Sequence, residues 1–346
     1  MKNKKLFIKT YGCQANINDS EILAANFIKR GYTIVNNETK ADVIFINSCS
    51  VKNKTQSKIL HYIKKHYSNK EIMITGCLIK TLDIKKQFPK IKLFDSSNLK
   101  RLGQTLIRKD KNIAIIQISQ GCLNKCTFCA TKTAKGKLKS FSPRDIKFEL
   151  ERAVKDGCKK IYLTSQDNGC YGFDIKPKIN LADLLKELIK VQGDFKIRIG
   201  MINPQHIRKF ISQLIEVYKN PKIIKFIHIP VQSGSDKVLK DMKRGHSVED
   251  FVKIALEFRK NFPRNKFADS TIATDIIIGY PSETEKDFQK TLKLIKNIKP
   301  EVLNISVFSS RPKTKAQKLK QLSSEIIKER TKKLNELYLN YRKKLR

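Results

Sequence analysis

The 346-residue chain lacks any apolar run of the roughly 20 residues that a membrane-spanning helix needs. It also lacks an apolar segment after its first residues, Met1-Lys2-Asn3-Lys4-Lys5, of the kind that a secretory signal contains. Its eight cysteines are therefore expected to stay reduced in the cytoplasm rather than to form disulfides. No internal repeat or low-complexity tract is present, and the length predicts about two domains with sizeable cores.

Acidic residues are scarce in this sequence. Only 32 Asp and Glu accompany 72 Lys and Arg, which gives a formal net charge of +40. A charge of this sign and size favours RNA or DNA as a partner over acidic proteins or small neutral substrates. An AT-biased coding sequence would also enrich lysine. The charge by itself therefore supports the hypothesis of a nucleic-acid partner and no more.

Three cysteines lie close together in the run Ser119-Gln120-Gly121-Cys122-Leu123-Asn124-Lys125-Cys126-Thr127-Phe128-Cys129. Their Cys-x-x-x-Cys-x-x-Cys spacing offers three thiolates to a [4Fe–4S] cluster and leaves one iron open to a small molecule. A zinc site more often contains Cys-x-x-Cys pairs, with a second pair further along the chain. The spacing therefore predicts an iron–sulfur cluster.

From residue 5 to about 95, short apolar runs alternate with helical stretches, which predicts a parallel α/β layer. The expected strands are 6–8, 43–46 and 72–74, and the expected helices cover 19–30 and 54–66. Cys13, Cys49 and Cys77 each follow one of these strands. Cysteine is common in buried cores, but the carboxyl ends of parallel strands share one edge, so these three are expected to converge. Their convergence favours a second metal or cluster site.

After a connector near 96–111, a second series of strands and helices is expected. The strands are at 113–118, 160–164, 195–199, 223–229, 271–278 and 302–307, and the helices are near 144–156, 181–191, 205–218, 248–261 and 283–297. Six β/α units predict a partial (β/α)6 barrel, whose active site lies at the carboxyl ends of the strands. The Cys122 loop follows the first of these strands.

From Leu322, a basic helix is expected, with an apolar stripe formed by Ile327, Leu334, Leu337, Tyr341 and Leu345.

Taken in order, these motifs resemble the methylthiotransferase family of radical S-adenosylmethionine (SAM) enzymes, which includes MiaB-, RimO- and MtaB-type proteins. The resemblance rests on Tyr11-Gly12-Cys13-Gln14-Ala15-Asn16, Asn47-Ser48-Cys49-Ser50-Val51, Gly76-Cys77, the Cys122 loop, the segment from His228 to Ser235, and Thr274-Asp275-Ile276-Ile277-Ile278-Gly279. It implies an N-terminal methylthiotransferase domain over 1–105, a radical SAM barrel over 106–321 and a basic C-terminal helix over 322–346.

The resemblance also implies two [4Fe–4S] clusters, with SAM as methyl donor and as radical source. The radical cluster would be held by Cys122, Cys126 and Cys129, and the auxiliary cluster by Cys13, Cys49 and Cys77. Gln166 and Asp167 occupy the place where many radical enzymes have Gly-Gly-Glu, which makes them expected SAM contacts. An electron donor, a sulfur source and tRNA are the implied partners.

The segment Cys129-Ala130-Thr131-Lys132-Thr133-Ala134-Lys135-Gly136 is similar to the archaeal and eukaryotic branch of the family. That branch is expected to convert N6-threonylcarbamoyladenosine, next to the anticodon, to its 2-methylthio derivative. Family members usually continue into an RNA-binding TRAM domain, and this chain is expected to lack one because it stops at Arg346. The alternatives are RimO-type methylthiolation of a ribosomal-protein aspartate, with the same clusters, and a non-catalytic RNA-binding protein with a structural metal. The charge and the segment after Cys129 favour tRNA.

The remaining cysteines and histidines give weaker predictions. Cys158 is expected to pack in the core, and Cys170 to lie on a loop at the functional end without a special role. His228 is as compatible with a ligand contact as with a core position. The other four, His61, His66, His206 and His246, carry no pattern that indicates a site.

Overall fold

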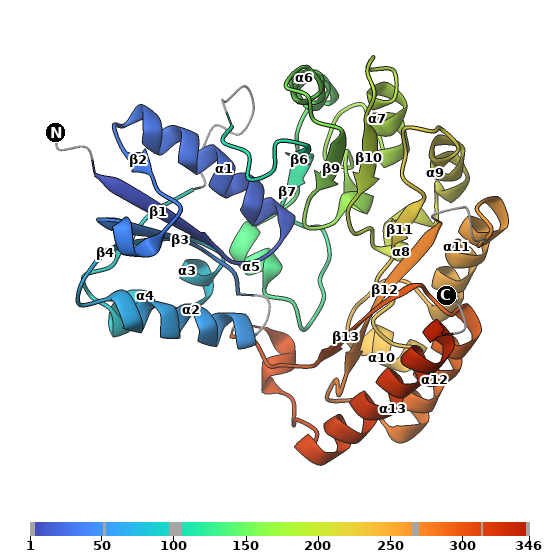
Figure 1. The fold of residues 1–346 in the computed structure, drawn as a ribbon. Coiled ribbons are helices and arrows are strands. Elements are labelled where there is room, and N and C mark those ends of the chain that lie inside the picture. The colour runs from blue at the N-terminus through green and yellow to red at the C-terminus, as the bar shows by residue number, and fades with distance from the viewer. Residues whose placement is uncertain (1–3, 51–52, 97–105, 265–269, 313, 344–346) are drawn as a thin grey trace.

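The computed structural model describes residues 4–50, 53–96, 106–264, 270–312 and 314–343. It is an α/β protein in which an N-terminal layer lies beside a larger, open barrel (Figure 1). The expected fold class is therefore confirmed. Within the described residues, no helix combines the length and the apolar character needed to cross a membrane.

The N-terminal layer is a parallel five-stranded sheet with the order β2-β1-β3-β4-β5. Its strands are β1 (Lys5–Thr10), β2 (Thr33–Ile34), β3 (Val43–Ser48), β4 (Glu71–Gly76) and β5 (Lys92–Leu93). Because side chains alternate along a strand, Val43 and Phe45 of β3 pack on the side of helix α1 (Gln14–Lys29). Ile44 and Ile46 pack on the side of helix α2 (Asn53–His66). The central strand is thus buried on both faces, which explains its continuous apolar sequence.

The barrel contains six parallel strands in chain order, with its two three-stranded halves joined by a bridge between Ile197 and Ile223. The strands are β6 (Ile113–Gln117), β9 (Lys160–Thr164), β10 (Lys196–Ile199), β11 (Phe226–His228), β12 (Thr271–Ile278) and β13 (Val302–Val307). The longer helices between them are α6 (Pro143–Lys155), α7 (Leu181–Leu188), α9 (Ile211–Tyr218), α11 (Val248–Asn261) and α12 (Glu285–Ile298). The six predicted strands are therefore present, with a longer helix after each of the first five.

One expected helix of the barrel, near 205–218, is divided in two. Asn203 caps a short helix α8 (Pro204–Ile207) by accepting a hydrogen bond from the Gln205 N–H at 3.2 Å. The chain then turns before α9 begins at Ile211. The division keeps α8 at the carboxyl ends of the strands, while α9 covers the outside of the barrel (Figure 1). A second difference is a small antiparallel pair, β7 (Ser119–Gln120) with β8 (Lys139–Ser140), which brackets the cysteine loop.

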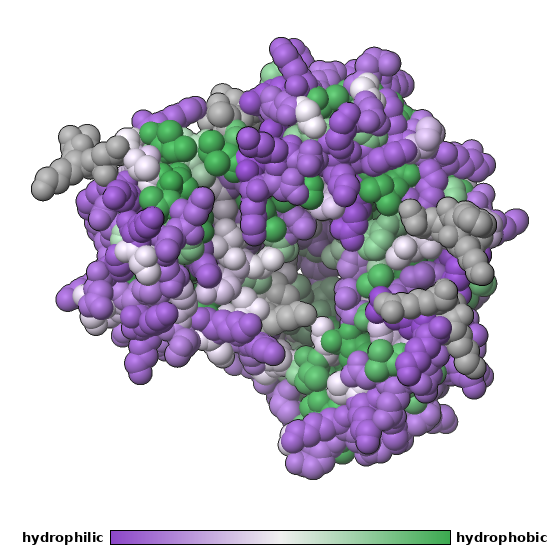
Figure 2. Space-filling view, viewed as in Figure 1, coloured by the Kyte–Doolittle hydropathy of each residue, from purple (hydrophilic) through white to green (hydrophobic). Residues whose placement is uncertain are grey.

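The last described helix, α13 (Ser324–Lys343), packs on α12 and on the strands β12 and β13. Of the predicted stripe, Leu334 and Tyr341 are buried and Ile327 and Leu337 pack against the barrel core, whereas Leu345 lies outside the described residues. Arg330 fixes the helix through a buried ion pair with Glu283 at 2.9 Å. The opposite face carries hydrophilic side chains, as the lower part of Figure 2 shows.

Several contacts join the N-terminal layer to the barrel. Lys135 forms an ion pair with Asp19 at 3.3 Å, and the Asn18 side chain donates a hydrogen bond to the carbonyl of Ile115 at 2.8 Å. Asn53, at the start of α2, hydrogen-bonds both Ser309 and Arg311. The expected domain boundary at 105 falls at the edge of residues 97–105, outside those described, and stays a prediction.

Candidate functional site

The loop that carries Cys122, Cys126 and Cys129 lies at the carboxyl end of β6, as the barrel prediction required. Gly121 begins it with a φ of +80°, and a Cβ atom there would lie 1.9 Å from the carbonyl oxygen of Lys137. Only glycine allows this close approach of two backbones. The Gly121 N–H donates a hydrogen bond to Oε1 of Gln166 at 2.6 Å, so the side chain after β9 fixes the start of the loop.

Each of these three thiols has a hydrogen-bond donor directed at its sulfur. The N–H groups of Asn124 and Thr131 lie 3.4 Å from the Sγ atoms of Cys122 and Cys129. The Arg244 guanidinium donates to Sγ of Cys126, also at 3.4 Å. Such donors favour the thiolate form over the thiol.

Burial acts in the opposite direction on the free thiols. Burial, the largest cause, raises the pKa of Cys122 to about 12 together with the neighbouring Asp167, Cys129 and Cys126. At neutral pH a bound metal would therefore have to displace the thiol proton, as metals do when thiols become ligands. Three convergent, half-buried sulfurs with donors around them fit an iron–sulfur cluster.

A buried hydrogen-bond network holds the middle of the cysteine loop. The Asp167 side chain is fully buried. Its Oδ1 accepts from the N–H groups of Gly169 and Asn203, both at 3.0 Å, and its Oδ2 accepts from Nδ2 of Asn124 at 2.7 Å. Nε2 of His206 lies 2.9 Å from Oδ1 of Asn124. The ends of β9 and β10 thus position the residue that lies between the first two cysteines.

Part of this network resembles a metal site in composition. Asp167, Cys170 and His206 offer ligand atoms that all lie within 4.8 Å of one another. However, both Asp167 oxygens already accept hydrogen bonds, and Sγ of Cys170 donates to the Asp167 carbonyl at 3.3 Å. Burial lowers the pKa of His206, so a neutral ring faces Asn124. The group is therefore explained as a hydrogen-bonded support for the loop.

The second set of cysteines gathers at the edge of the N-terminal sheet, after the adjacent strands β1, β3 and β4. Gly12 has a φ of +117°, and a Cβ atom there would lie 2.9 Å from Cβ of Cys49. Burial, with smaller contributions from the nearby Cys49 and Cys13, raises the pKa of Cys77 to about 12. The structure thus brings together three thiols that are far apart in sequence, as the strand ends predicted.

Positive charges surround this second set. Lys135 lowers the pKa of Cys77 and forms the buried ion pair with Asp19. Arg311, which is also buried, interacts electrostatically with Cys49. Lys135 ends the short helix α5 (Thr131–Lys135), which begins two residues after Cys129 and contacts helix α3 (Leu78–Thr81). One short helix therefore connects the two cysteine sets.

Other predicted residues have structural partners. Cys158 is buried and donates to the Lys111 carbonyl, and Nε2 of His228 lies 2.9 Å from Asp275. No sequence pattern indicated a role for Asn124, His206 or Arg244. An amide between two cysteines has no pattern of its own, and Arg244 meets Cys126 across 118 residues.

Replacing Asn124 with alanine is expected to weaken the loop. The change leaves the buried Asp167 Oδ2 and His206 Nε2 without this partner, and a buried unpaired group costs about 1–3 kcal/mol. We expect a lower free energy of unfolding by that amount and faster loss of iron to a chelator. Asn335→Ala on the exposed side of α13, where the amide bonds only the Thr331 carbonyl, is the matched control. Equal iron loss from both variants would contradict the positioning role.

Two protein-family models match the chain. The radical SAM superfamily matches residues 116–295, and the uncharacterized protein family UPF0004 matches residues 5–95. The fold is shared with solved radical SAM proteins, among them TsrM of Kitasatospora setae, with a TM-score of 0.62 at 10% identity over 92% of this chain and 77% of that one. The enzyme OxsB gives a TM-score of 0.58 at 12% identity over 98% of this chain and 56% of that one. The chain belongs to the radical SAM superfamily.

Curated relatives narrow this class. A Pyrococcus abyssi protein named probable threonylcarbamoyladenosine tRNA methylthiotransferase is 40% identical over 97% of this chain and 84% of its own length. The human threonylcarbamoyladenosine tRNA methylthiotransferase is 36% identical over 98% of this chain and 63% of its own length. The chain is therefore a member of the threonylcarbamoyladenosine tRNA methylthiotransferase family.

Proposed function

We propose that this protein converts N6-threonylcarbamoyladenosine in tRNA to its 2-methylthio derivative, with SAM and two [4Fe–4S] clusters. The observation that carries the proposal is the presence of two separate sets of three convergent cysteines in one chain, connected by helix α5. Cleavage of SAM needs the set in the barrel, and transfer of a sulfur atom needs a second site that can hold it. The names of the relatives supply the substrate.

Each cysteine set would hold one cluster. Cys122, Cys126 and Cys129 would hold the cluster in the barrel, and Cys13, Cys49 and Cys77 the cluster in the N-terminal layer. When bound, the first cluster supplies the electron that cleaves SAM, and the second supplies an open iron for the sulfur to be transferred. A radical is needed because the C2–H bond of adenine is not acidic enough for a protein base to remove its proton.

The chain's own residues orient these groups. Gln166 holds the start of the cysteine loop through Gly121, and Arg244 directs a positive charge at Cys126. Of the two expected SAM contacts, we retain Gln166, which is partly exposed and belongs to the loop's immediate surroundings. Asp167 is fully buried and accepts a hydrogen bond from Asn124. We therefore propose that it does not contact SAM but positions the cysteine loop beside it.

The proposal requires partners that lie outside this chain. The net charge of +40 suits tRNA, whose phosphates make it a polyanion. An electron donor must reduce the cluster in the barrel, and a sulfur source must replace the sulfur that is transferred. We place this reaction in the cytoplasm, where tRNA is modified and thiols remain reduced.

Mass spectrometry of tRNA nucleosides from cells with and without the gene tests the proposed function. We expect the 2-methylthio derivative of N6-threonylcarbamoyladenosine to disappear and its precursor to accumulate when the gene is deleted. Loss of a methylthio group from a ribosomal-protein aspartate, with unchanged tRNA, would support the RimO-type alternative. No change in either product would support a non-catalytic role.

A further inference from the structure

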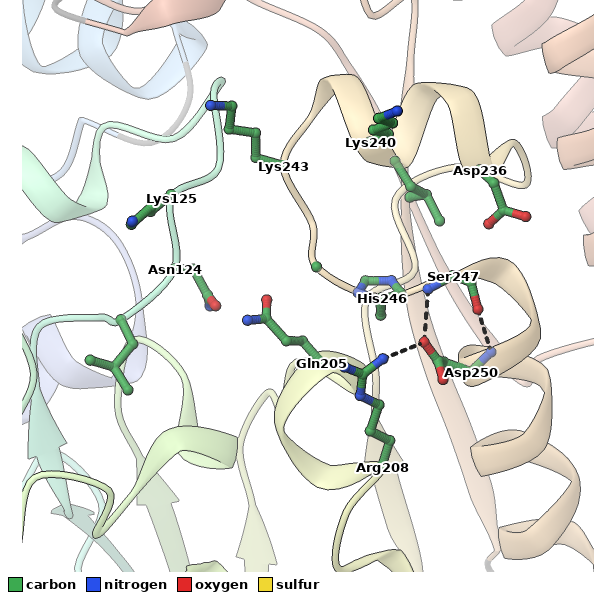
Figure 3. Close-up of a pocket in the computed structure, with 13 residues that line it drawn as sticks. Asn124, Lys125, Gln205, Arg208, Asp236, Lys240, Lys243, His246, Ser247 and Asp250 are labelled. Atoms are coloured by element: carbon green, nitrogen blue, oxygen red, sulfur yellow. Dashed lines mark hydrogen bonds and ion pairs between the residues drawn. The ribbon is translucent and has the colours of Figure 1, made fainter.

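A pocket of about 840 Å³ lies between the cysteine loop and the segment that joins β11 to α11 (Figure 3). The loop contributes Leu123, Asn124 and Lys125 to its lining, and α8 contributes Gln205. The opposite wall comes from helix α10 (Asp236–Asp241) and the turn that follows it. The two walls are fixed to each other, because the Thr127 N–H donates to the carbonyl of Met242 at 3.1 Å. We call this cavity the basic pocket.

The charges in the basic pocket are unbalanced. Lys125, Lys240 and Lys243 are exposed on its walls, and in the part of the chain that the structure describes none of them forms an ion pair. The acidic groups of the lining are already engaged. Asp250 pairs with Arg208 at 2.9 Å, and Asp236 accepts from the Val248 N–H at 2.7 Å. Three ammonium groups therefore remain available to an anion.

A buried side chain in the same pocket has no side-chain partner. His246 is only 7% exposed, and in the part of the chain that the structure describes its ring nitrogens meet no side-chain group, while the backbone of Arg244 and Val231 interacts with the ring. Buried polar groups usually have well-formed hydrogen bonds, which this ring can gain from a ligand. Burial lowers the pKa of His246 to about 4, so the ring is neutral at physiological pH and offers one N–H donor. In Figure 3 the Gln205 amide points toward Asn124 of the cysteine loop, and the His246 ring lies next to Ser247.

We propose that the basic pocket binds a backbone phosphate of the RNA substrate, beside the reacting nucleotide. Ammonium groups, an imidazole N–H and an amide N–H are the donors that bind phosphate oxygens in proteins. Lys125 lies directly before Cys126, so a phosphate held here lies next to the proposed site of SAM cleavage. The identity of the RNA as tRNA rests on the proposed function.

A concave pocket with a buried histidine favours a phosphate group over a protein partner. The surface of a folded protein contacts exposed lysines, but it does not reach a ring that is nine-tenths buried. A phosphate with its attached sugar is small enough to enter. The alternative occupant, an acidic electron-carrier protein that docks on the three lysines, therefore becomes an outcome of the test.

The test compares two triple variants that lower the net charge equally. In the first, Lys125, Lys240 and Lys243 become glutamine. In the control, glutamine replaces Lys155, Lys260 and Lys296, which are exposed in the last turns of α6, α11 and α12, at the opposite end of the barrel. The affinity of each reconstituted protein for tRNA is measured over a range of salt concentrations. Iron content and melting temperature establish that each variant is folded and loaded.

We expect the pocket variant to bind tRNA more weakly than the control and with a flatter salt dependence. The slope of log K against log salt should shift by about 0.7–0.9 for each phosphate that the variant no longer neutralises. A His246→Ala variant should weaken binding with little change in slope, since it removes no charge. Equal affinities and slopes for the two triple variants would overturn the proposal. So would a pocket variant with unchanged tRNA binding that is no longer reduced by flavodoxin, because that result assigns the pocket to electron delivery.

This comparison is independent of the methylthio product. Binding of tRNA without product would count against the proposed function, and the difference between the two triple variants would still decide the role of the pocket.

Discussion

Alanine at Cys122, Cys126 or Cys129 is expected to abolish the formation of 5′-deoxyadenosine from SAM. Each change removes one of three thiolates from the cluster proposed to cleave SAM, and no other cysteine lies on this loop. The loss should be complete, to the level of protein without iron. Chromatography of the reaction products, after anaerobic reconstitution with iron and sulfide and with dithionite as reductant, measures it.

Cys158→Ala is the matched control for these variants. Cys158 is buried in the barrel core. Its thiol donates a hydrogen bond to the Lys111 carbonyl, away from both cysteine sets. This variant should keep its iron and its 5′-deoxyadenosine formation. Near-normal cleavage of SAM by any of the three loop variants would refute the assignment of this cluster.

The triple variant Cys13→Ala, Cys49→Ala and Cys77→Ala is expected to separate the two halves of the reaction. These thiols lie on the N-terminal sheet and share no backbone segment with the cysteine loop. The variant should retain about half of the iron, as expected for one of two [4Fe–4S] clusters. It should still cleave SAM but transfer no methylthio group to tRNA. Iron analysis and nucleoside mass spectrometry on the same preparation make the comparison.

An unchanged iron content in this triple variant would show that the sheet edge holds no cluster. Loss of all iron would show that the two sites do not form independently.

Lys135 provides a further check, because it interacts with Cys77 and pairs with Asp19. The Lys135→Met variant removes a cation that pairs with the buried Asp19 carboxylate, and it should impair the N-terminal site more than SAM cleavage.

The parts of the fold that the sequence predicted are those with local patterns. Val43 to Ile46 form a continuous apolar run because β3 is covered on both faces, and this pattern is visible without a structure. The helix expected near 205–218 was wrong as one element. The helix is divided because Asn203 caps α8 and a turn follows α8. This arrangement lets His206 contact Asn124, and a tertiary contact of this kind leaves no local pattern in the sequence. The β7–β8 pair was missed because each strand has only two residues.

The residues of the candidate site also fall into those that the sequence predicted and those that only the structure identified. The cysteines were predicted because cluster ligation imposes a spacing on a loop and parallel strands impose a common edge. The groups that support them come from distant parts of the chain. Asp167 reaches Asn124 across 43 residues, and Arg244 reaches Cys126 across 118. Neither contact has a local pattern, so only the folded structure assigns these residues a place beside the cysteines.

The central claim is that this chain transfers a methylthio group to N6-threonylcarbamoyladenosine in tRNA. The most direct measurement is an anaerobic reaction of the reconstituted protein with tRNA that carries this nucleoside, SAM with a deuterated methyl group, sulfide and dithionite. The tRNA is then digested and its nucleosides are analysed by mass spectrometry. The proposed function predicts a 2-methylthio product that carries the deuterated methyl group, together with 5′-deoxyadenosine. Cleavage of SAM with an unchanged nucleoside, while a ribosomal-protein aspartate gains the methylthio group under the same conditions, would contradict it.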